Sequence, residues 1–152
     1  MKLIWLTDIH LNFLSKERRI DFYQEIVATS GEKILISGDI AEVPSVSAIL
    51  KEIAQAIQKP IYFVLGNHDY YRGQIDLLRQ EMSDLTKNEP LLQWLPASGV
   101  QDLGNQTILL SEDCWADGRY GDYTNSRVTL NDSRMIIDLF QSSILGKYSL
   151  NF

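Results

Sequence analysis

Three short polar clusters hold the side chains of this chain that could bind a metal ion. The clusters are Asp8-Ile9-His10, Gly38-Asp39 and Gly66-Asn67-His68-Asp69. Carboxylate oxygens, an amide oxygen and imidazole nitrogens are ligands that hard or borderline divalent cations accept. The chain has two histidines, and both lie in these clusters. Taken together, the clusters predict a metal site.

Each cluster follows a short apolar run of the kind that forms a buried strand. The runs cover residues 3–6, 34–36 and 61–65 and are rich in Ile and Leu, as buried parallel strands are. Between them, in residues 15–30 and 44–58, apolar residues recur at helical spacing. We expect the first of these helices to face the core with Ile20, Tyr23, Ile26 and Val27.

This alternation of strands and helices predicts an α/β fold in which the clusters come together. Ligands of open parallel sheets bind outside the carboxyl ends of the strands, so the three loops should converge on one face. If the backbone stays extended, Asp8 and His10 point the same way, because side chains alternate along a strand. Gly38 and Gly66 allow tight turns and a close approach of backbone to ligand, because glycine has no Cβ.

Each cluster also has an ordinary interpretation. Polar residues at strand ends are commonly solvated, and Asn and Asp beside Gly form turns. Gly121-Asp122 repeats the Gly-Asp pair with no predicted strand before it. The combination of all three clusters, in this order and fold context, favours a metal site over three unrelated turns.

The three clusters resemble the first three motifs of the calcineurin-like metallophosphoesterases, over about residues 1–72. The resemblance implies a metallophosphoesterase-like α/β sandwich, of which this chain holds the N-terminal βαβαβ portion. It implies two divalent ions, Mn²⁺ foremost, with Fe or Zn²⁺ as alternatives. It also implies hydrolysis of phosphate mono- or diesters, with a small-molecule phosphoester or a phosphoprotein as the substrate.

The resemblance also implies roles for single residues. The implied metal ligands are Asp8 and His10 for the first ion, Asp39 between the two ions, and Asn67 for the second. His68 would face the phosphate and the leaving group, and Asp69 would orient His68. A carboxylate beside an imidazole fixes its tautomer and raises its basicity, so His68 could donate a proton. Two ions about 3.5–4 Å apart can activate water and clamp an in-line displacement at phosphorus.

The second half of the chain departs from this family. Family members also supply histidines from their C-terminal half, whereas this chain has none after His68. We expect the acids Asp113, Asp117 and Asp122 to be solvated loop residues rather than replacement ligands. Residues 1–152 are therefore expected to form a calcineurin-like metallophosphoesterase domain that is incomplete at its C-terminal end, with impaired activity. The alternative is a diverged homologue that has lost the metals.

Later segments carry weaker patterns. Residues 73–87 predict a helix, and residues 100–103 and 107–110 predict a hairpin that turns at Gly104-Asn105. Residues 135–140 predict another helix.

Residues 114–123, rich in Gly and aromatic side chains, resemble a region of some bacterial family members. They could form a lid over the site, or an ordinary surface loop.

The composition predicts a cytoplasmic protein. Cys114 is the single cysteine, so an internal disulfide is impossible, and a reduced thiol is typical of the cytoplasm. The apolar run 3–6 is too short for a signal peptide or a membrane span, so we expect no membrane partner. The net charge of −6 disfavours nonspecific nucleic-acid binding without excluding a nuclease.

Arg72, just after the third cluster, could contact a substrate phosphate. The oligomeric state stays open.

Three functions follow from this reasoning. The first is a metal-dependent phosphoesterase, and the second is a non-catalytic remnant of the fold or a regulatory binding protein. The third is a different metal hydrolase with a similar Asp-His constellation. Hydrolysis of an aryl phosphate with added Mn²⁺ separates the first two, whereas the third predicts hydrolysis of a non-phosphate ester or an amide.

Overall fold

A four-stranded parallel sheet forms the centre of the computed structural model, which describes residues 1–113, 122, 125–128 and 130–144. The strands lie side by side in the order β1 (Leu3–Leu6), β2 (Lys33–Ser37), β3 (Ile61–Val64) and β4 (Leu92–Trp94). The first three confirm the predicted strands. β4 was not predicted, because three residues with the polar Gln93 in the middle carry too little strand pattern.

The register of the strands brings their carboxyl ends to one edge of the sheet. Ile4 lies beside Ile34, Ile34 beside Ile61, and Ile61 beside Leu92. Strands paired in this way end close together, and the crevice outside those ends is where parallel sheets bind ligands. The loops after β1, β2 and β3 carry the three polar clusters to this edge.

Three helices cover one face of the sheet, and all three were predicted from the sequence. They are α1 (Lys16–Ala28), α2 (Val46–Ile57) and α3 (Ile75–Asn88). Their buried side chains form one core cluster with alternate strand residues, which include Ile34, Ile36, Ile61 and Phe63. The α/β class predicted from the sequence is therefore confirmed.

Helix α1 buries less than its periodicity predicted. Tyr23 and Ile26 are buried, whereas Ile20 and Val27 are 42% and 46% exposed. The helix contacts α2 through a narrow stripe, where the guanidinium of Arg19 donates to both carboxylate oxygens of Glu52 at 2.9 Å. Ile20 and Val27 lie beside that stripe and line a shallow hollow of about 400 Å³.

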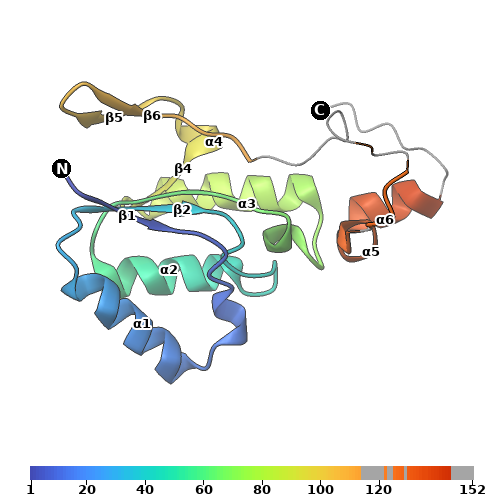
Figure 1. Ribbon diagram of the computed structural model, residues 1–152, viewed down its shortest axis with the longest axis horizontal. Helices are drawn as coiled ribbons and strands as arrows, with labels where there is room; N and C mark the ends of the chain where they lie inside the picture. The colour runs from blue at the N-terminus through green and yellow to red at the C-terminus, as the bar shows by residue number, and fades with distance from the viewer. Residues whose placement is uncertain (114–121, 123–124, 129, 145–152) are drawn as a thin grey trace.

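The opposite face of the sheet is only partly covered. Figure 1 shows α4 (Leu95–Ser98) and the hairpin of β5 (Gln101–Gly104) and β6 (Thr107–Leu109) on this side, away from α1 and α2. The apolar cluster here is small, and it consists of Tyr62, Leu95 and Leu103 with Leu35, Val64 and Leu109 against it. At β1, Leu3 and Trp5 are 41% and 70% exposed.

The hairpin confirms the sequence prediction, with its turn one residue later. The turn residues Asn105 and Gln106 have φ angles of 52° and 60°, as the tight turns of two-residue hairpins require.

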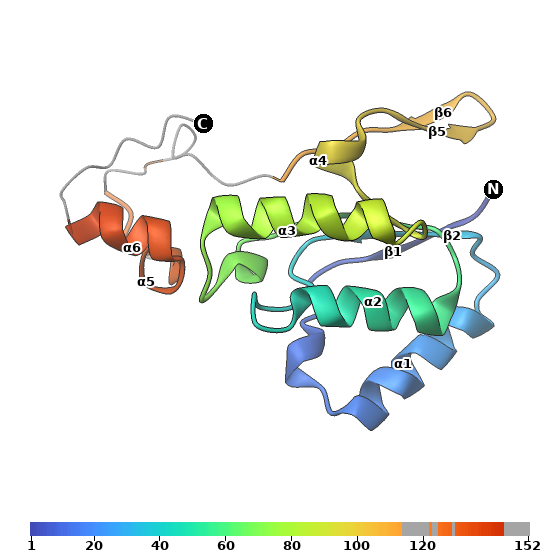
Figure 2. The ribbon, with the colours of Figure 1, turned by 180° about the vertical axis from the view of Figure 1, so that it is seen from behind.

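The helix predicted at residues 135–140 is instead two helices, α5 (Asp132–Met135) and α6 (Ile137–Ile144). The buried Ile136 between them has an extended backbone, which ends the first helix. Figure 2 shows both at the opposite end of the molecule from the hairpin, near one end of α3. The proposed lid, residues 114–123, lies outside the described residues apart from Asp122. Among the helices that the structure describes, none has the length and apolar character needed to cross a bilayer.

Candidate metal site

The loops after β1 and β2 are joined directly by backbone hydrogen bonds. The N–H of Asp8 donates to the Gly38 carbonyl at 3.3 Å, and the N–H of His10 donates to the Asp39 carbonyl at 3.0 Å. The first two polar clusters therefore lie against each other, as the sheet topology predicted.

Asp69 joins the loop after β3 to the loop after β2. Its carboxylate is fully buried and accepts backbone N–H groups at 2.7–2.9 Å from Asp39, Ile40, Ala41 and Gly66. Burial raises the pKa of Asp69 to about 7, and the backbone N–H donors act in the opposite direction. Both oxygens of Asp69 thus accept hydrogen bonds that hold the third cluster against the second.

Two glycines allow this close approach. A Cβ on Gly66 would lie 2.2 Å from Oδ1 of Asp39, and a Cβ on Gly38 would lie 2.7 Å from the backbone nitrogen of Gly66. Gly38 also has a φ of 93°, which L side chains rarely adopt. Both glycines therefore allow the loops to pack around Asp39, whereas the sequence suggested a close approach of backbone to a ligand.

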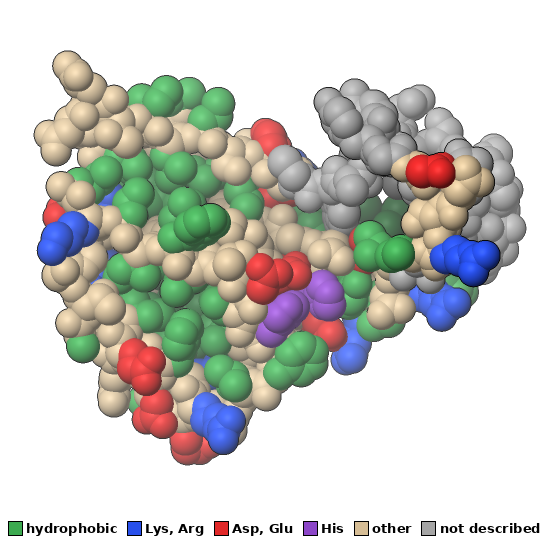
Figure 3. Space-filling view, in the orientation of Figure 1, with side chains coloured by type: hydrophobic (Ala, Val, Ile, Leu, Met, Phe, Trp, Pro, Cys, Tyr) green, Lys and Arg blue, Asp and Glu red, His purple; other side chains and the backbone are tan. Residues whose placement is uncertain are grey.

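The side chains of Asp8, His10 and Asp39 converge at this edge. Each offers one ligand atom, and the three atoms lie within 4.8 Å of one another. Atoms that bind one ion at about 2.0–2.6 Å lie within about 5 Å of each other, so this set fits a divalent cation. Figure 3 shows both histidines at the surface beside acidic side chains, where an ion and a substrate can reach them.

The backbone at these three residues differs from the expected extended form. Asp8, His10 and Asp39 have φ angles of 51°, 40° and 53°, in the left-handed region. The side chains of Asp8 and His10 still reach Asp39, because the chain turns at each residue rather than alternating along a strand. Non-glycine residues seldom have positive φ, so three at one site set it apart from ordinary loops.

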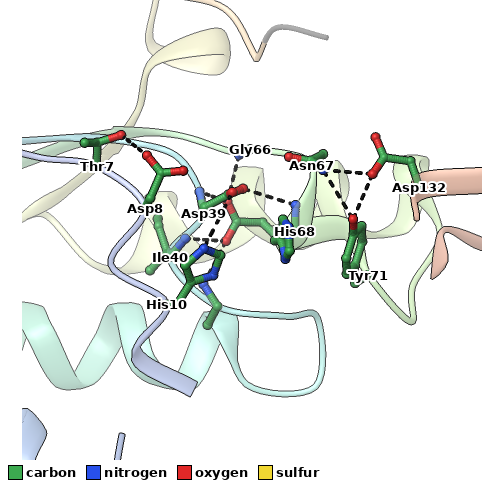
Figure 4. Close-up of polar contacts among 12 residues, drawn as sticks. Thr7, Asp8, His10, Asp39, Ile40, Gly66, Asn67, His68, Tyr71 and Asp132 are labelled. Carbon is green, nitrogen blue, oxygen red and sulfur yellow. Dashed lines mark hydrogen bonds and ion pairs between the residues drawn. The ribbon is translucent and has the colours of Figure 1, made fainter. Parts of the chain in front are cut away.

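Asn67 and His68 lie next to this group. The backbone N–H of His68 donates to Oδ1 of Asp39 at 3.1 Å. The side-chain nitrogen of Asn67 donates to Asp132 at 2.8 Å, so its amide oxygen is turned the other way. Figure 4 shows that oxygen on the side of Asp39.

The ring of His68 is held by aromatic neighbours. It meets the His10 ring edge to face, with centroids 4.9 Å apart, and it lies 4.3 Å from the Tyr71 ring. Among the interactions of the described residues, none joins His68 to the carboxylate of Asp69. The structure therefore brings His68 beside His10 and Asp39 but does not show the predicted pairing with Asp69.

Asp113 does not behave as the solvated acid that was expected. Its side chain is 2% exposed and accepts hydrogen bonds from the Leu65 N–H, the Tyr70 hydroxyl, the Trp94 indole and the Arg79 guanidinium. These contacts tie the segment after β6 to β3, β4 and α3. Asp122 is exposed, as expected, and Asp117 lies outside the described residues.

Arg72 has a partner within the chain. Its Nε lies 3.0 Å from a carboxylate oxygen of Glu42, and its side chain is 63% exposed. Contact with a substrate phosphate stays a prediction, and such a contact would compete with Glu42.

Asp132 and Tyr71 are the contributors that sequence reasoning missed. The Tyr71 hydroxyl donates to Asp132 at 2.8 Å, and Asp132 also receives the side chain of Asn67. An Asp that begins a short helix looks like an ordinary cap, so the sequence alone carries no signal for this contact.

The comparisons with known proteins agree with the geometry. The family model described as calcineurin-like phosphoesterase matches residues 1–141. The search of curated proteins and the search of solved structures returned no match. The matched region contains all three loops of the site, together with α5 and most of α6. The chain therefore belongs to the calcineurin-like phosphoesterase family.

Proposed function

We propose that this chain binds two divalent ions at the edge of the sheet and hydrolyses phosphate mono- or diesters there. The observation that supports this most directly is the convergence of ligand atoms from Asp8, His10 and Asp39 within 4.8 Å. Family membership agrees, because metal-dependent phosphoester hydrolysis is the activity that the family suggests.

The donors of the site suit this assignment. The proposed ligands are Asp8 and His10 for one ion, Asp39 between the two ions, and Asn67 for the other. The two oxygens of the Asp39 carboxylate allow it to lie between both ions, and the amide of Asn67 adds an oxygen without further negative charge. When bound, such ions activate water and neutralise charge on phosphoryl oxygens.

His68 is the residue best placed to act on the substrate. Its ring lies between the rings of His10 and Tyr71, and its backbone is fixed to Asp39. When protonated, its imidazole can neutralise charge on the phosphate or give a proton to the leaving oxygen. Asp69 supports this arrangement through the loops, because it holds the backbone N–H groups of both Asp39 and Gly66.

The proposed ion is Mn²⁺, with Fe and Zn²⁺ as alternatives, as the family resemblance implies, and oxygen and imidazole donors without a thiolate are compatible with these ions. The proposed substrate is a small-molecule phosphoester or a phosphoprotein, and a cytoplasmic location goes with it.

Titration with Mn²⁺, followed by assays with p-nitrophenyl phosphate and bis(p-nitrophenyl) phosphate, tests the proposal. We expect weak binding, because no histidine after His68 is available as a ligand, and slow hydrolysis that a chelator abolishes. Asp39→Ala should lose both binding and hydrolysis. Asp21→Ala, which changes an exposed acid on α1, should lose neither.

The result separates the proposal from its alternatives. Mn²⁺ binding without hydrolysis of either ester would favour a non-catalytic binding protein. Binding that survives Asp39→Ala would exclude this site.

A further inference from the structure

Asp132 lies behind the proposed metal site, although it follows Asn67 by 65 residues. It is 7% exposed, and its Oδ1 receives both the Asn67 side-chain nitrogen and the Tyr71 hydroxyl at 2.8 Å. Figure 4 shows Asn67 between Asp132 on one side and Asp39 on the other. The contact therefore falls on the side of Asn67 that is remote from the other proposed ligands.

The segment that carries Asp132 is fixed to the loop that carries Asn67. The N–H of Arg72 donates to the Met135 carbonyl at 2.7 Å, and the N–H of Ile137 donates to the Gly73 carbonyl at 3.1 Å. A carboxylate oxygen of Asp138 accepts the Ile75 N–H at 2.8 Å. Asp132 is thus held in place by contacts on both sides of the break at Ile136.

The chemistry of the contact decides which way the Asn67 amide points. A carboxylate oxygen accepts hydrogen bonds, so Asp132 pairs with the NH₂ group of Asn67 rather than with its oxygen. The Tyr71 hydroxyl donates to the same Oδ1 atom at 2.8 Å. With its nitrogen held there, Asn67 presents its oxygen to the site.

We propose that Asp132 is a positioning residue, which selects the orientation of Asn67 that can bind a divalent ion. This inference rests on the proposed function, because it gives a reason for the Asn67 oxygen to face the second ion. Without Asp132, the remaining partner of the Asn67 nitrogen is the Tyr71 hydroxyl at 3.3 Å. A hydroxyl can accept from the NH₂ group or donate to the amide oxygen, so the amide can rotate and present to the site its NH₂ group, which cannot ligate a cation.

A cycle of variants, measured by calorimetric titration with Mn²⁺, tests the inference. Asp132→Ala should weaken binding by about 10–100-fold, as is typical when a group that orients a ligand is removed. Asn67→Ala should weaken it to a similar degree. If Asp132 acts through Asn67, adding Asp132→Ala to Asn67→Ala should cause little further loss.

Asp132→Asn separates orientation from charge. An asparagine removes the negative charge but keeps an oxygen, and the Tyr71 hydroxyl, which donates at this position, favours the orientation in which that oxygen accepts the Asn67 nitrogen. We therefore expect Asp132→Asn to restore most of the affinity lost in Asp132→Ala. Equal losses in the two variants would show that charge or direct ligation acts, and would overturn the inference. A full additional loss in the Asn67→Ala background would overturn it as well.

If Asp132→Ala does not fold, NMR spectroscopy of the unaltered chain tests the inference instead. In NMR spectra, the side-chain NH₂ signals of Asn67 should shift when Mg²⁺ is added and should stay protected from exchange with water. Signals that do not respond to saturating Mg²⁺ would overturn the inference. Absence of any ion binding by the unaltered chain would overturn the proposed function too, whereas unchanged Mn²⁺ affinity in Asp132→Ala would overturn the inference alone.

Discussion

At the scale of single residues, the site depends on the missing Cβ of Gly66 as well as on the side chains that form it. Asp39 is the centre of the arrangement, because its carboxylate oxygens face His10 and the His68 N–H. The carboxylate keeps this place only because Gly66 has no Cβ to occupy it.

Gly66→Ala should therefore damage the site. The added Cβ would lie 2.2 Å from Oδ1 of Asp39 and must displace that carboxylate. We expect Mn²⁺ affinity to fall at least tenfold, as measured by calorimetry. Gly99→Ala is the control, because a Cβ on Gly99 would have no neighbour within 4 Å, although its φ of 61° is one that L side chains rarely adopt. Unchanged affinity in Gly66→Ala would contradict this description of Asp39.

His68→Ala should separate catalysis from metal binding. If His68 acts on the phosphate, the variant should keep most of its Mn²⁺ affinity and lose about 10²–10⁴-fold in rate. The loss should shrink for esters with an activated leaving group, which need no proton. A variant that loses metal in proportion to rate would make His68 a ligand instead.

At the scale of elements, long-range contacts decide what the sequence could reveal. Local periodicity and turn residues predict β1 to β3, α1 to α3 and the hairpin, and the order of these elements predicts the convergence of the three clusters. The short β4, the burial of Asp113 and the place of Asp132 depend on partners distant in the chain. Such residues look like ordinary polar residues until their partners are known.

Asp113→Ala should destabilise the fold more than the same substitution at an exposed acidic residue. The substitution leaves the Leu65 N–H, the Tyr70 hydroxyl and the Trp94 indole without this acceptor. A buried donor that loses its acceptor typically costs about 1–3 kcal/mol, whereas the charged partner Arg79 is 37% exposed and stays accessible to water. Urea denaturation should show a loss of this order for Asp113→Ala. The exposed Asp122→Ala should change the unfolding free energy by less than about 0.5 kcal/mol.

At the scale of the whole molecule, the two faces of the sheet differ in how well they are covered. Parallel sheets are normally buried on both faces, yet the β1 side of this sheet leaves Leu3 and Trp5 exposed. Figure 3 shows apolar side chains at the surface in the region of β1 and β2. Exposed apolar patches promote association.

We therefore expect the chain to self-associate as its concentration rises, as measured by analytical ultracentrifugation. Trp5→Gln should reduce the association, because it removes the largest exposed apolar side chain of β1. Phe13→Gln is a matched control, since Phe13 is equally exposed, at 70%, but lies on η1 (Leu11–Phe13). A strictly monomeric chain at high concentration would contradict the expectation.

The left-handed backbone of Asp8, His10 and Asp39 means that this site stores conformational strain, of about 1–3 kcal/mol per residue. Part of the folding free energy thus opposes the geometry proposed to bind the ion, so we expect a gain in stability here to be accompanied by a loss of metal binding. Asp8→Gly relieves strain at an exposed residue with a φ of 51°. In urea denaturation without metal, the variant should be more stable than the unaltered chain by about 1 kcal/mol, although it loses a proposed ligand.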